Sequence, residues 1–186
     1  QLQEDVSRIR DASSFEEAVK SLHESVNPLK IDPELVKESL HYSGRGRFLK
    51  LLMYLIVYRN NARDWFTKVR LGWLSDNEIN RDFTIQVHHF FPRSLLKSMG
   101  TPLEKIDTVA NIVFINPGTN RRLRTSPNVY IEKYKISREE LGKQLIPLNE
   151  ELWDVRNYDK FLDVRAEIIA KETMNYLKNL YPEYYS

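Results

Sequence analysis

The sequence predicts an α+β fold that is mainly helical, a helical bundle with one small strand–strand–helix module embedded in it. Apolar residues at helical spacing and helix-capping sequences dominate both ends of the chain. Two short segments near the middle, 83–88 and 112–115, have the pattern of strands instead. We therefore expect an N-terminal helical region over 1–75, a core module over 76–125 and C-terminal helices over 126–186 that pack on the N-terminal bundle.

The N-terminal region carries clear helix boundaries. Ser-Phe-Glu-Glu at 14–17 is a capping box that starts a helix, and Asn-Pro at 27–28 ends it. Asp-Pro at 32–33 supplies an N-cap followed by proline at the first helical position, and Ser-Gly-Arg-Gly at 43–46 breaks that second helix. Apolar residues fall on nearly every side of the segment 47–62, which predicts a helix buried at the centre of the bundle.

The middle of the chain changes character. Residues 83–88 alternate between apolar and polar side chains, as a half-buried strand does, and a short helical stretch follows at 93–99. Ile-Val-Phe-Ile at 112–115 predicts a second strand, stopped by Asn-Pro-Gly at 116–118. A helix is expected to start within 119–123.

The last third is helical again. Ser-Pro at 126–127 predicts a short helix that reaches Tyr134, and a capping box at 137–140 starts another. Residues 158–180 form a long amphipathic pattern. The aromatic tail after it is expected to dock on the bundle.

Composition excludes several classes of protein. With 41% hydrophobic and 29% charged residues, the chain is globular, and its net charge of +2 is too small to hold nucleic acid without local clusters of arginine. The absence of cysteine excludes disulfides, thiolate zinc sites and a cysteine nucleophile. The longest apolar run, 51–58, is well short of the ~20 residues that cross a bilayer, and the polar, acidic start is no signal peptide. We expect no membrane association, a cytoplasmic setting and, because the first residue is not methionine, a piece of a longer protein.

The pair His88-His89 is the first candidate site. Neighbouring residues on a strand point to opposite faces, but Phe-Phe-Pro at 90–92 predicts that the strand ends here, so both imidazoles can serve one site. Downstream, Asn111 precedes the second strand and Asn120 follows the turn after it. An amide oxygen suits a hard divalent ion such as Mg²⁺, and Asn120 at the start of a helix would face the strand that carries His88.

These residues together resemble the His-Asn-His (HNH) nuclease signature with its ββα-metal fold. The resemblance implies a metal-dependent DNA endonuclease of the nickase type, with His88 and Asn120 as metal ligands, His89 as the general base and Asn111 as a brace for the loop. Many members have histidine where this chain has Asn120, a departure that favours Mg²⁺ or Mn²⁺ over Zn²⁺ or Ni²⁺. The products implied are a 5′-phosphate and a 3′-hydroxyl.

A narrower resemblance covers residues 47–180. Its elements are His-His-Phe-Phe-Pro-Arg-Ser, Ala-Asn-Ile-Val at 110–113, Thr-Asn-Arg-Arg at 119–122, Ser-Pro at 126–127 and Phe-Leu-x-x-Arg at 161–165. Together these are similar to the C-terminal part of the GmrSD-type modification-dependent restriction and phage-defence proteins. That similarity implies modified phage DNA as the substrate and a ParB-like, nucleotide-dependent N-terminal domain as a partner. Cutting both strands would need a homodimer or two visits.

Four arginines flank the predicted site and are the candidates for contacts with DNA phosphates: Arg93, Arg121, Arg122 and Arg124. Alternatively, these arginines, above all Arg122 and Arg124, lie on a solvated helix face and contact no DNA. Two further alternatives stay open: Asp107 is a third ligand or a helix cap, and Asn116 competes with Asn120 as a ligand. The whole chain also admits a non-catalytic reading, as a DNA-binding or partner-docking helical module with a degenerate HNH core.

Overall fold

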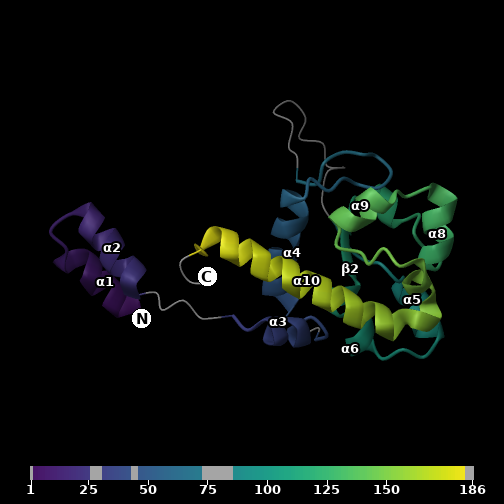
Figure 1. Ribbon diagram of the computed structural model, residues 1–186, viewed down its shortest axis with the longest axis horizontal. Coiled ribbons are helices and arrows are strands. Elements are labelled where there is room, and N and C mark those ends of the chain that lie inside the picture. The colour runs from purple at the N-terminus through teal and green to yellow at the C-terminus, as the bar shows by residue number, and fades with distance from the viewer. Residues whose placement is uncertain (1, 26–30, 43–45, 73–85, 183–186) are drawn as a thin grey trace.

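The fold is mainly helical, with one two-stranded sheet, as expected for this α+β class (Figure 1). The computed structural model describes residues 2–25, 31–42, 46–72 and 86–182. Its α-helices and strands follow in chain order: α1 Leu2–Asp11, α2 Phe15–Ser25, α3 Pro33–Ser39, α4 Gly46–Arg59, β1 Gln86–His89, α5 Arg93–Ser98, α6 Leu103–Ile106, β2 Ile112–Ile115, α7 Pro117–Asn120, α8 Pro127–Tyr134, α9 Arg138–Lys143 and α10 Tyr158–Leu180. Short 3₁₀ turns precede β2 (η2, Val109–Asn111) and α10 (η3, Glu150–Trp153; η4, Val155–Asn157).

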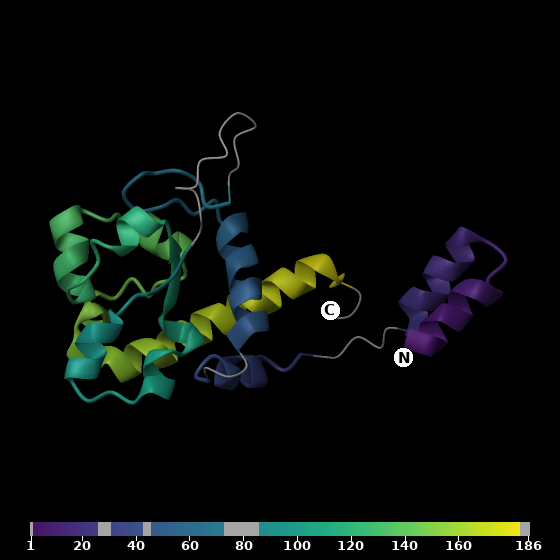
Figure 2. The same ribbon diagram turned by 180° about the vertical axis from the view of Figure 1, so that it is seen from behind.

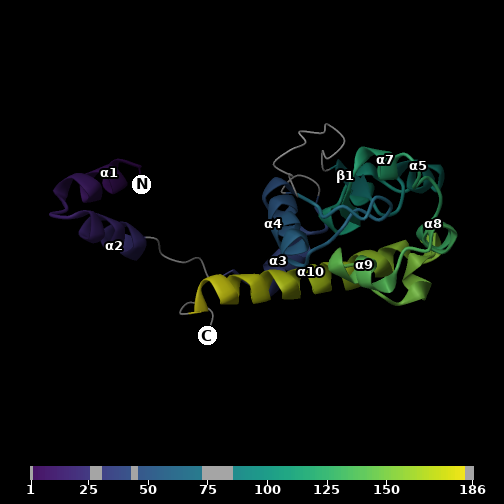
Figure 3. The ribbon, with the colours of Figure 1, turned by 90° about the horizontal axis from the view of Figure 1, so that it is seen from above.

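Helix α10 is the longest element and runs along one side of the body, where α3, α4 and the η2 turn pack against it (Figures 1 and 3). Its apolar stripe includes Phe161, which is fully buried and stacks on Phe90 with a centroid separation of 5.0 Å and an interplanar angle of 6°. Phe91 meets the same ring edge-on at 4.9 Å. The two residues that follow the histidine pair are therefore anchored in the core by the C-terminal helix.

The sheet is a single antiparallel pair, with His88 opposite Val113 and His89 opposite Ile112. Every residue of β2 is buried, and its bounds are those the sequence predicts. The free edge of β2 is closed by the buried side chain of Gln144, whose amide accepts a hydrogen bond from the Phe114 N–H and donates one to the Phe114 carbonyl. This side chain thus occupies the place of a third strand.

Local capping signals set most helix starts correctly. Asp32 caps α3 by accepting from the Glu34 N–H, and Ser137 caps α9 by accepting from the Glu140 N–H. The box before α2 is altered: Ser14 accepts from the Glu17 N–H, but the Glu17 carboxylate reaches back to Ser13 rather than to Ser14. The helix expected at 119–123 begins earlier, at Pro117, because Asn116 acts as its N-cap.

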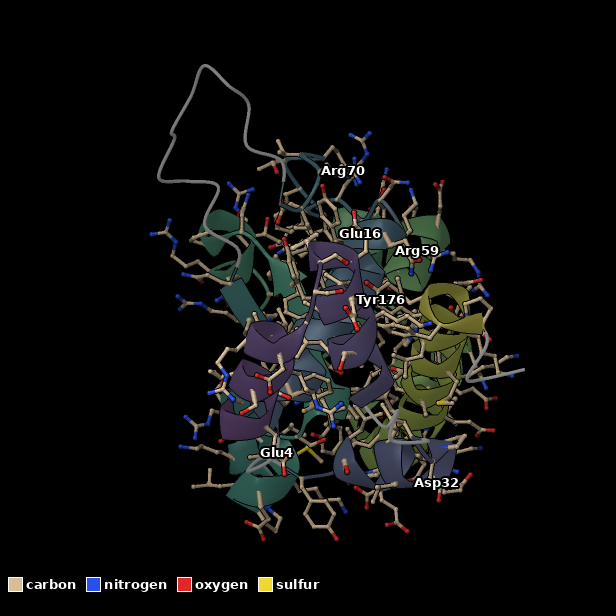
Figure 4. The ribbon with its side chains drawn as sticks, turned by 90° about the vertical axis from the view of Figure 1, so that its left-hand side faces the viewer. Glu4, Glu16, Asp32, Arg59, Arg70 and Tyr176 are labelled. Carbon is tan, nitrogen blue, oxygen red and sulfur yellow. The ribbon has the colours of Figure 1, made fainter. Side chains whose placement is uncertain are left out.

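The expectation that 47–62 forms a helix buried on all sides is wrong. The buried face of α4 includes Met53, Ile56 and Val57, but Phe48, Leu51, Leu55 and Tyr58 are between 36% and 65% exposed. These four residues follow helical spacing and form one apolar stripe. At the far end of α4, Arg59 lies over the ring of Tyr176 on α10, 5.7 Å from its centroid (Figure 4).

Helices α1 and α2 pack on each other and stand apart from the rest of the molecule in Figures 1, 2 and 3. The expected break at 27–28, the first residues of the strand predicted from 83 and the end of the aromatic tail lie outside the described residues. So does the break expected at 43–46, except for Gly46, which begins α4. Within the described ranges, none of the helices combines the length and the apolarity needed to cross a membrane.

Candidate functional site

Strand β1 ends at His89, so the two histidines sit where the strand gives way to a turn. The alternation of the strand directs them differently: Val87 is half exposed, His88 is buried with 7% of its surface accessible, and the His89 side chain is 24% exposed. His88 therefore faces the interior of the module, and His89 lies at its margin.

The turn after the pair is held by hydrogen bonds at every backbone polar group of Phe90 and Phe91. Asn111 supplies three of these bonds: its carbonyl accepts from the Phe90 N–H at 2.7 Å, its Oδ1 accepts from the Phe91 N–H at 2.9 Å, and its Nδ2 donates to the Phe91 carbonyl at 3.3 Å. The Tyr130 hydroxyl donates to the Phe90 carbonyl at 2.8 Å. Asn111 is fully buried and also donates to the Ile106 carbonyl at 3.1 Å, so it fixes the turn that carries both histidines.

His88 and Asn120 come together from β1 and α7. The Nε2 atom of His88 is buried and has no hydrogen-bond partner among the described residues. Burial lowers the pKa of His88 to about 4, with a smaller lowering from His89, while the nearby Asn120 amide acts in the opposite direction. Asn120 is oriented by Gln86, whose Oε1 accepts from its Nδ2 at 2.9 Å. At neutral pH the imidazole is uncharged, which is the form that binds a metal ion.

His89 belongs to a second group that includes a carboxylate. Its Nε2 lies 2.9 Å from Asp107 Oδ1, and Arg93 donates to Asp107 Oδ2 at 3.0 Å. Burial lowers the pKa of His89, and the bond to Asp107 opposes this. The structure thus places Arg93, expected to contact a DNA phosphate, in an ion pair. Asp107 is the C-cap residue of α6, and its carboxylate contacts both His89 and Arg93.

The structure separates the two asparagines that compete as ligands. The Oδ1 atom of Asn116 accepts from the Thr119 N–H at 2.8 Å and caps α7, so that oxygen already has a partner. Asn120 is the last residue of α7 and lies beside His88. Asn120 therefore lies beside His88, whereas Asn116 caps α7.

The three arginines after Asn120 are all exposed. The guanidinium of Arg122 lies over the Phe66 ring at 5.4 Å from its centroid, and Arg124 Nε donates to the Arg121 carbonyl at 3.0 Å. Within the described part of the chain, no carboxylate pairs with Arg121. These exposed cations directly follow Asn120 in the chain.

Two residues that hold the site together were not predicted as such. Arg165 of α10 is fully buried, and its guanidinium donates to the carbonyls on both sides of Asn111, those of Ala110 at 3.0 Å and Ile112, and to those of Gln144 and Leu145. Burial lowers its pKa to about 9. A charged residue inside the apolar stripe of a long helix is the signal that points to it. The second residue, Asp64, is buried and bonds to the start of α7.

The described residues offer few donors for a metal ion at this site. The described residues contain no group of three or more histidine, cysteine, aspartate or glutamate side chains able to hold a metal. What they offer is the unpartnered buried nitrogen of His88 together with the amide of Asn120. Mg²⁺ is commonly held by few protein ligands and several waters, whereas zinc sites use at least three protein ligands.

Comparison with known proteins adds one distant relative. No family model matches the chain, and no solved structure matches it. An uncharacterized protein of Methanocaldococcus jannaschii, MJ0686, is 20% identical over 196 aligned positions, which cover 89% of this chain and 32% of the relative. The chain therefore spans about a third of the length of the curated relative it matches.

Proposed function

We propose that this chain is a metal-dependent HNH-type endonuclease that hydrolyses DNA phosphodiester bonds. One observation carries the proposal: His88 is buried beside Asn120 and its Nε2 has no hydrogen-bond partner among the described residues, while the adjacent His89 contacts the carboxylate of Asp107. A structural pair of histidines would not require this division. The resemblance to the HNH signature assigns different roles to these same two histidines.

His89 has the chemistry of a general base. Its Nε2 faces Asp107, and a carboxylate accepts only, so the ring proton sits on Nε2 and the Nδ1 lone pair is left to take a proton from water. Burial lowers the pKa of His89 and so favours the uncharged ring, which is the form able to accept a proton. Asp107, itself held by Arg93, thereby fixes both the tautomer and the orientation of the base.

His88 and Asn120 would hold the divalent ion, for which Mg²⁺ or Mn²⁺ fits the donors best. When bound, such an ion relieves charge on the scissile phosphate and on the leaving oxygen. The contribution of Asn111 is positional, because its hydrogen bonds hold the turn that sets His88 and His89 in place. A single site of this kind cuts one strand, so nicking is the reaction proposed.

The wider role proposed is that of the catalytic part of a restriction or phage-defence protein acting on modified DNA, with a ParB-like, nucleotide-dependent domain elsewhere in the same protein. The length of the relative supports this proposal of a longer, multidomain protein, because the relative is about three times as long as the part that aligns.

A plasmid-nicking assay tests the proposal. Wild type is expected to convert supercoiled plasmid to open circles with Mg²⁺ or Mn²⁺ and to stop on addition of EDTA, and His89→Ala is expected to lose at least 100-fold in rate, as loss of a general base typically costs about 10²–10⁴-fold. The matched control is His41→Ala, which removes a histidine with only a 3.7 Å contact to Asp163. Equal rates for wild type and His89→Ala would overturn the assignment of the base.

One feature favours a second candidate, a module that docks a partner. The apolar stripe of α4 formed by Phe48, Leu51, Leu55 and Tyr58 is exposed, and such stripes mark interaction surfaces. The partner-docking function is favoured if wild type cuts no plasmid with any of Mg²⁺, Mn²⁺ and Zn²⁺. Both activities can coexist in one chain.

A further inference from the structure

The basic residues beside the candidate site come from two segments far apart in the sequence. Residues 63–72 and 116–126 together contain six of the 28 basic residues and one of the 26 acidic ones. Of the six, Arg63, Lys68 and the three arginines after Asn120 are exposed. A chain with a net charge of only +2 therefore concentrates positive charge at this place.

The single acidic residue, Asp64, joins the two segments through its buried side chain. It is 1% exposed, and its carboxylate accepts hydrogen bonds from the N–H groups of Phe66 and Thr67 in its own loop. From the second segment, the same carboxylate accepts hydrogen bonds from the Asn116 N–H at 2.9 Å and from the Thr119 hydroxyl at 2.7 Å. These hydrogen bonds to the buried carboxylate fix the loop against the start of α7.

A cavity of about 220 Å³ lies between the joined segments, lined among others by Phe66, Thr67, Asn116, Arg121 and Arg122. The stacking of Arg122 on Phe66 holds that guanidinium at the cavity wall. Guanidinium groups bind phosphate oxygens through paired N–H donors, so the lining suits a phosphate group.

One of the three cations of the loop packs on an aromatic ring instead of adding to the exposed charge. Arg70, labelled in Figure 4, lies over the ring of Tyr58 on α4, 4.7 Å from its centroid. Lys68 has a left-handed backbone (φ 61°) and is exposed next to Thr67, and its carbonyl accepts from Arg63 at 2.9 Å. Arg63 and Lys68 are therefore the exposed cations that the loop adds to the arginines after Asn120.

We propose that the loop 63–69 and the arginines after Asn120 form one surface that binds backbone phosphates of a DNA strand as it leaves the candidate site, with the cavity at Phe66 receiving one phosphate. The inference rests on the proposed function for the identity of the nucleic acid. Arg121 directly follows Asn120, so a strand bound at the His88–Asn120 pair passes the cavity next.

The salt dependence of DNA binding tests this surface. Affinity for a labelled duplex is measured by fluorescence anisotropy between 50 and 300 mM KCl, in the His89→Ala background so that no cutting intervenes. Each lost phosphate contact is expected to lower the slope of log K against log salt by about 0.9, which is about eight-fold in affinity at 0.1 M salt. Lys68→Asn and Arg121→Gln are each expected to show this loss, and asparagine suits the left-handed backbone at 68.

The matched control is Lys171→Gln, which removes an exposed charge from α10, on the opposite side of the body from α7 in Figure 3. Asp64→Asn separates positioning from charge. It removes a negative charge, so a surface that worked by net charge alone would bind more tightly. Because the amide group replaces an acceptor that the loop needs, we expect several-fold weaker binding, with far-UV circular dichroism verifying that the variant is folded.

The outcomes separate this inference from the nuclease proposal. If wild type nicks plasmid but Lys68→Asn and Arg121→Gln keep the wild-type slope, the surface is wrong and the nuclease stands. If both slopes fall while wild type never nicks, the surface stands and the nuclease fails. Absence of DNA binding by wild type, or tighter binding to single-stranded RNA than to duplex DNA, overturns the inference.

Discussion

Replacing Asn111 by alanine removes the side chain that joins the histidine turn to the core. The asparagine amide makes three hydrogen bonds, with the N–H and the carbonyl of Phe91 and with the carbonyl of Ile106. All three groups belong to buried residues, and alanine leaves each without a partner. The structure therefore predicts a large loss of stability from one small substitution.

The magnitude follows from the count of groups left unsatisfied. A buried polar group without a partner costs about 1–3 kcal/mol, and entry of water into the vacated space recovers part of this. We expect the free energy of unfolding to fall by roughly 3–5 kcal/mol, a large part of the about 5–15 kcal/mol that is typical of a domain. Asn111→Asp is a more specific test. It keeps the oxygen that accepts from the Phe91 N–H, but it replaces the amide NH₂ group by a second oxygen, which faces the Phe91 and Ile106 carbonyls. Its deficit relative to wild type is expected to shrink at acid pH, where the protonated carboxyl can donate again.

Urea unfolding at 25 °C, followed by far-UV circular dichroism, measures both variants. The control is Asn128→Ala, at an exposed position whose amide accepts only from the adjacent Val129 N–H, and a change of about 0.5 kcal/mol or less is expected there. A loss below about 1 kcal/mol for Asn111→Ala would refute the reasoning, because it would mean that these hydrogen bonds contribute no more than a single exposed one.

Three further predictions use the same assay. Arg165→Leu leaves four backbone carbonyls without their donor and is expected to cost roughly 3–5 kcal/mol; a loss under about 1 kcal/mol contradicts the role of the guanidinium. Tyr130→Phe removes only the bond to the Phe90 carbonyl and is expected to cost about 1 kcal/mol, so a neutral result would argue against that bond. The folded-state pKa of His88, about 4, lies below its usual value of 6.5, so its contribution is complete above pH 6.5 and is lost as the pH falls toward 4. Metal-free wild type should lose about 2–3 kcal/mol more than His88→Gln between pH 7.5 and 4.5, and parallel losses would exclude His88 as the cause.

Local signals in the sequence predicted much of the fold because they act within a few residues. The caps at Asp32 and Ser137 and the prolines at 33 and 127 fix helix starts wherever the rest of the chain lies. The apolar run 112–115 is bounded on both sides by residues that disfavour a strand, and β2 has those bounds. The sequence indicates the histidine pair as a candidate site because the chain has only four histidines.

What the sequence could not predict depends on partners distant along the chain. Asp64 bonds to residues in its own loop and to Asn116 and Thr119, and no spacing rule links these positions. Arg165 bonds to backbone carbonyls, which every residue has, so its partners leave no trace in the sequence. The exposed stripe of α4 was missed for a related reason: apolar residues show that a face can be buried, but not whether another element covers it.

The position of Arg165 in the last helix also determines when the site can form. During synthesis, β1, the η2 turn and α7 leave the ribosome well before α10 does. Until that helix is complete, the carbonyls of Ala110 and Ile112 lack their buried donor, and Phe90 and Phe91 lack the ring of Phe161. A nascent chain thus holds the histidines and Asn120 without the framework that aligns them. A cell that makes this protein is exposed to an assembled site only after nearly all of these residues have been translated.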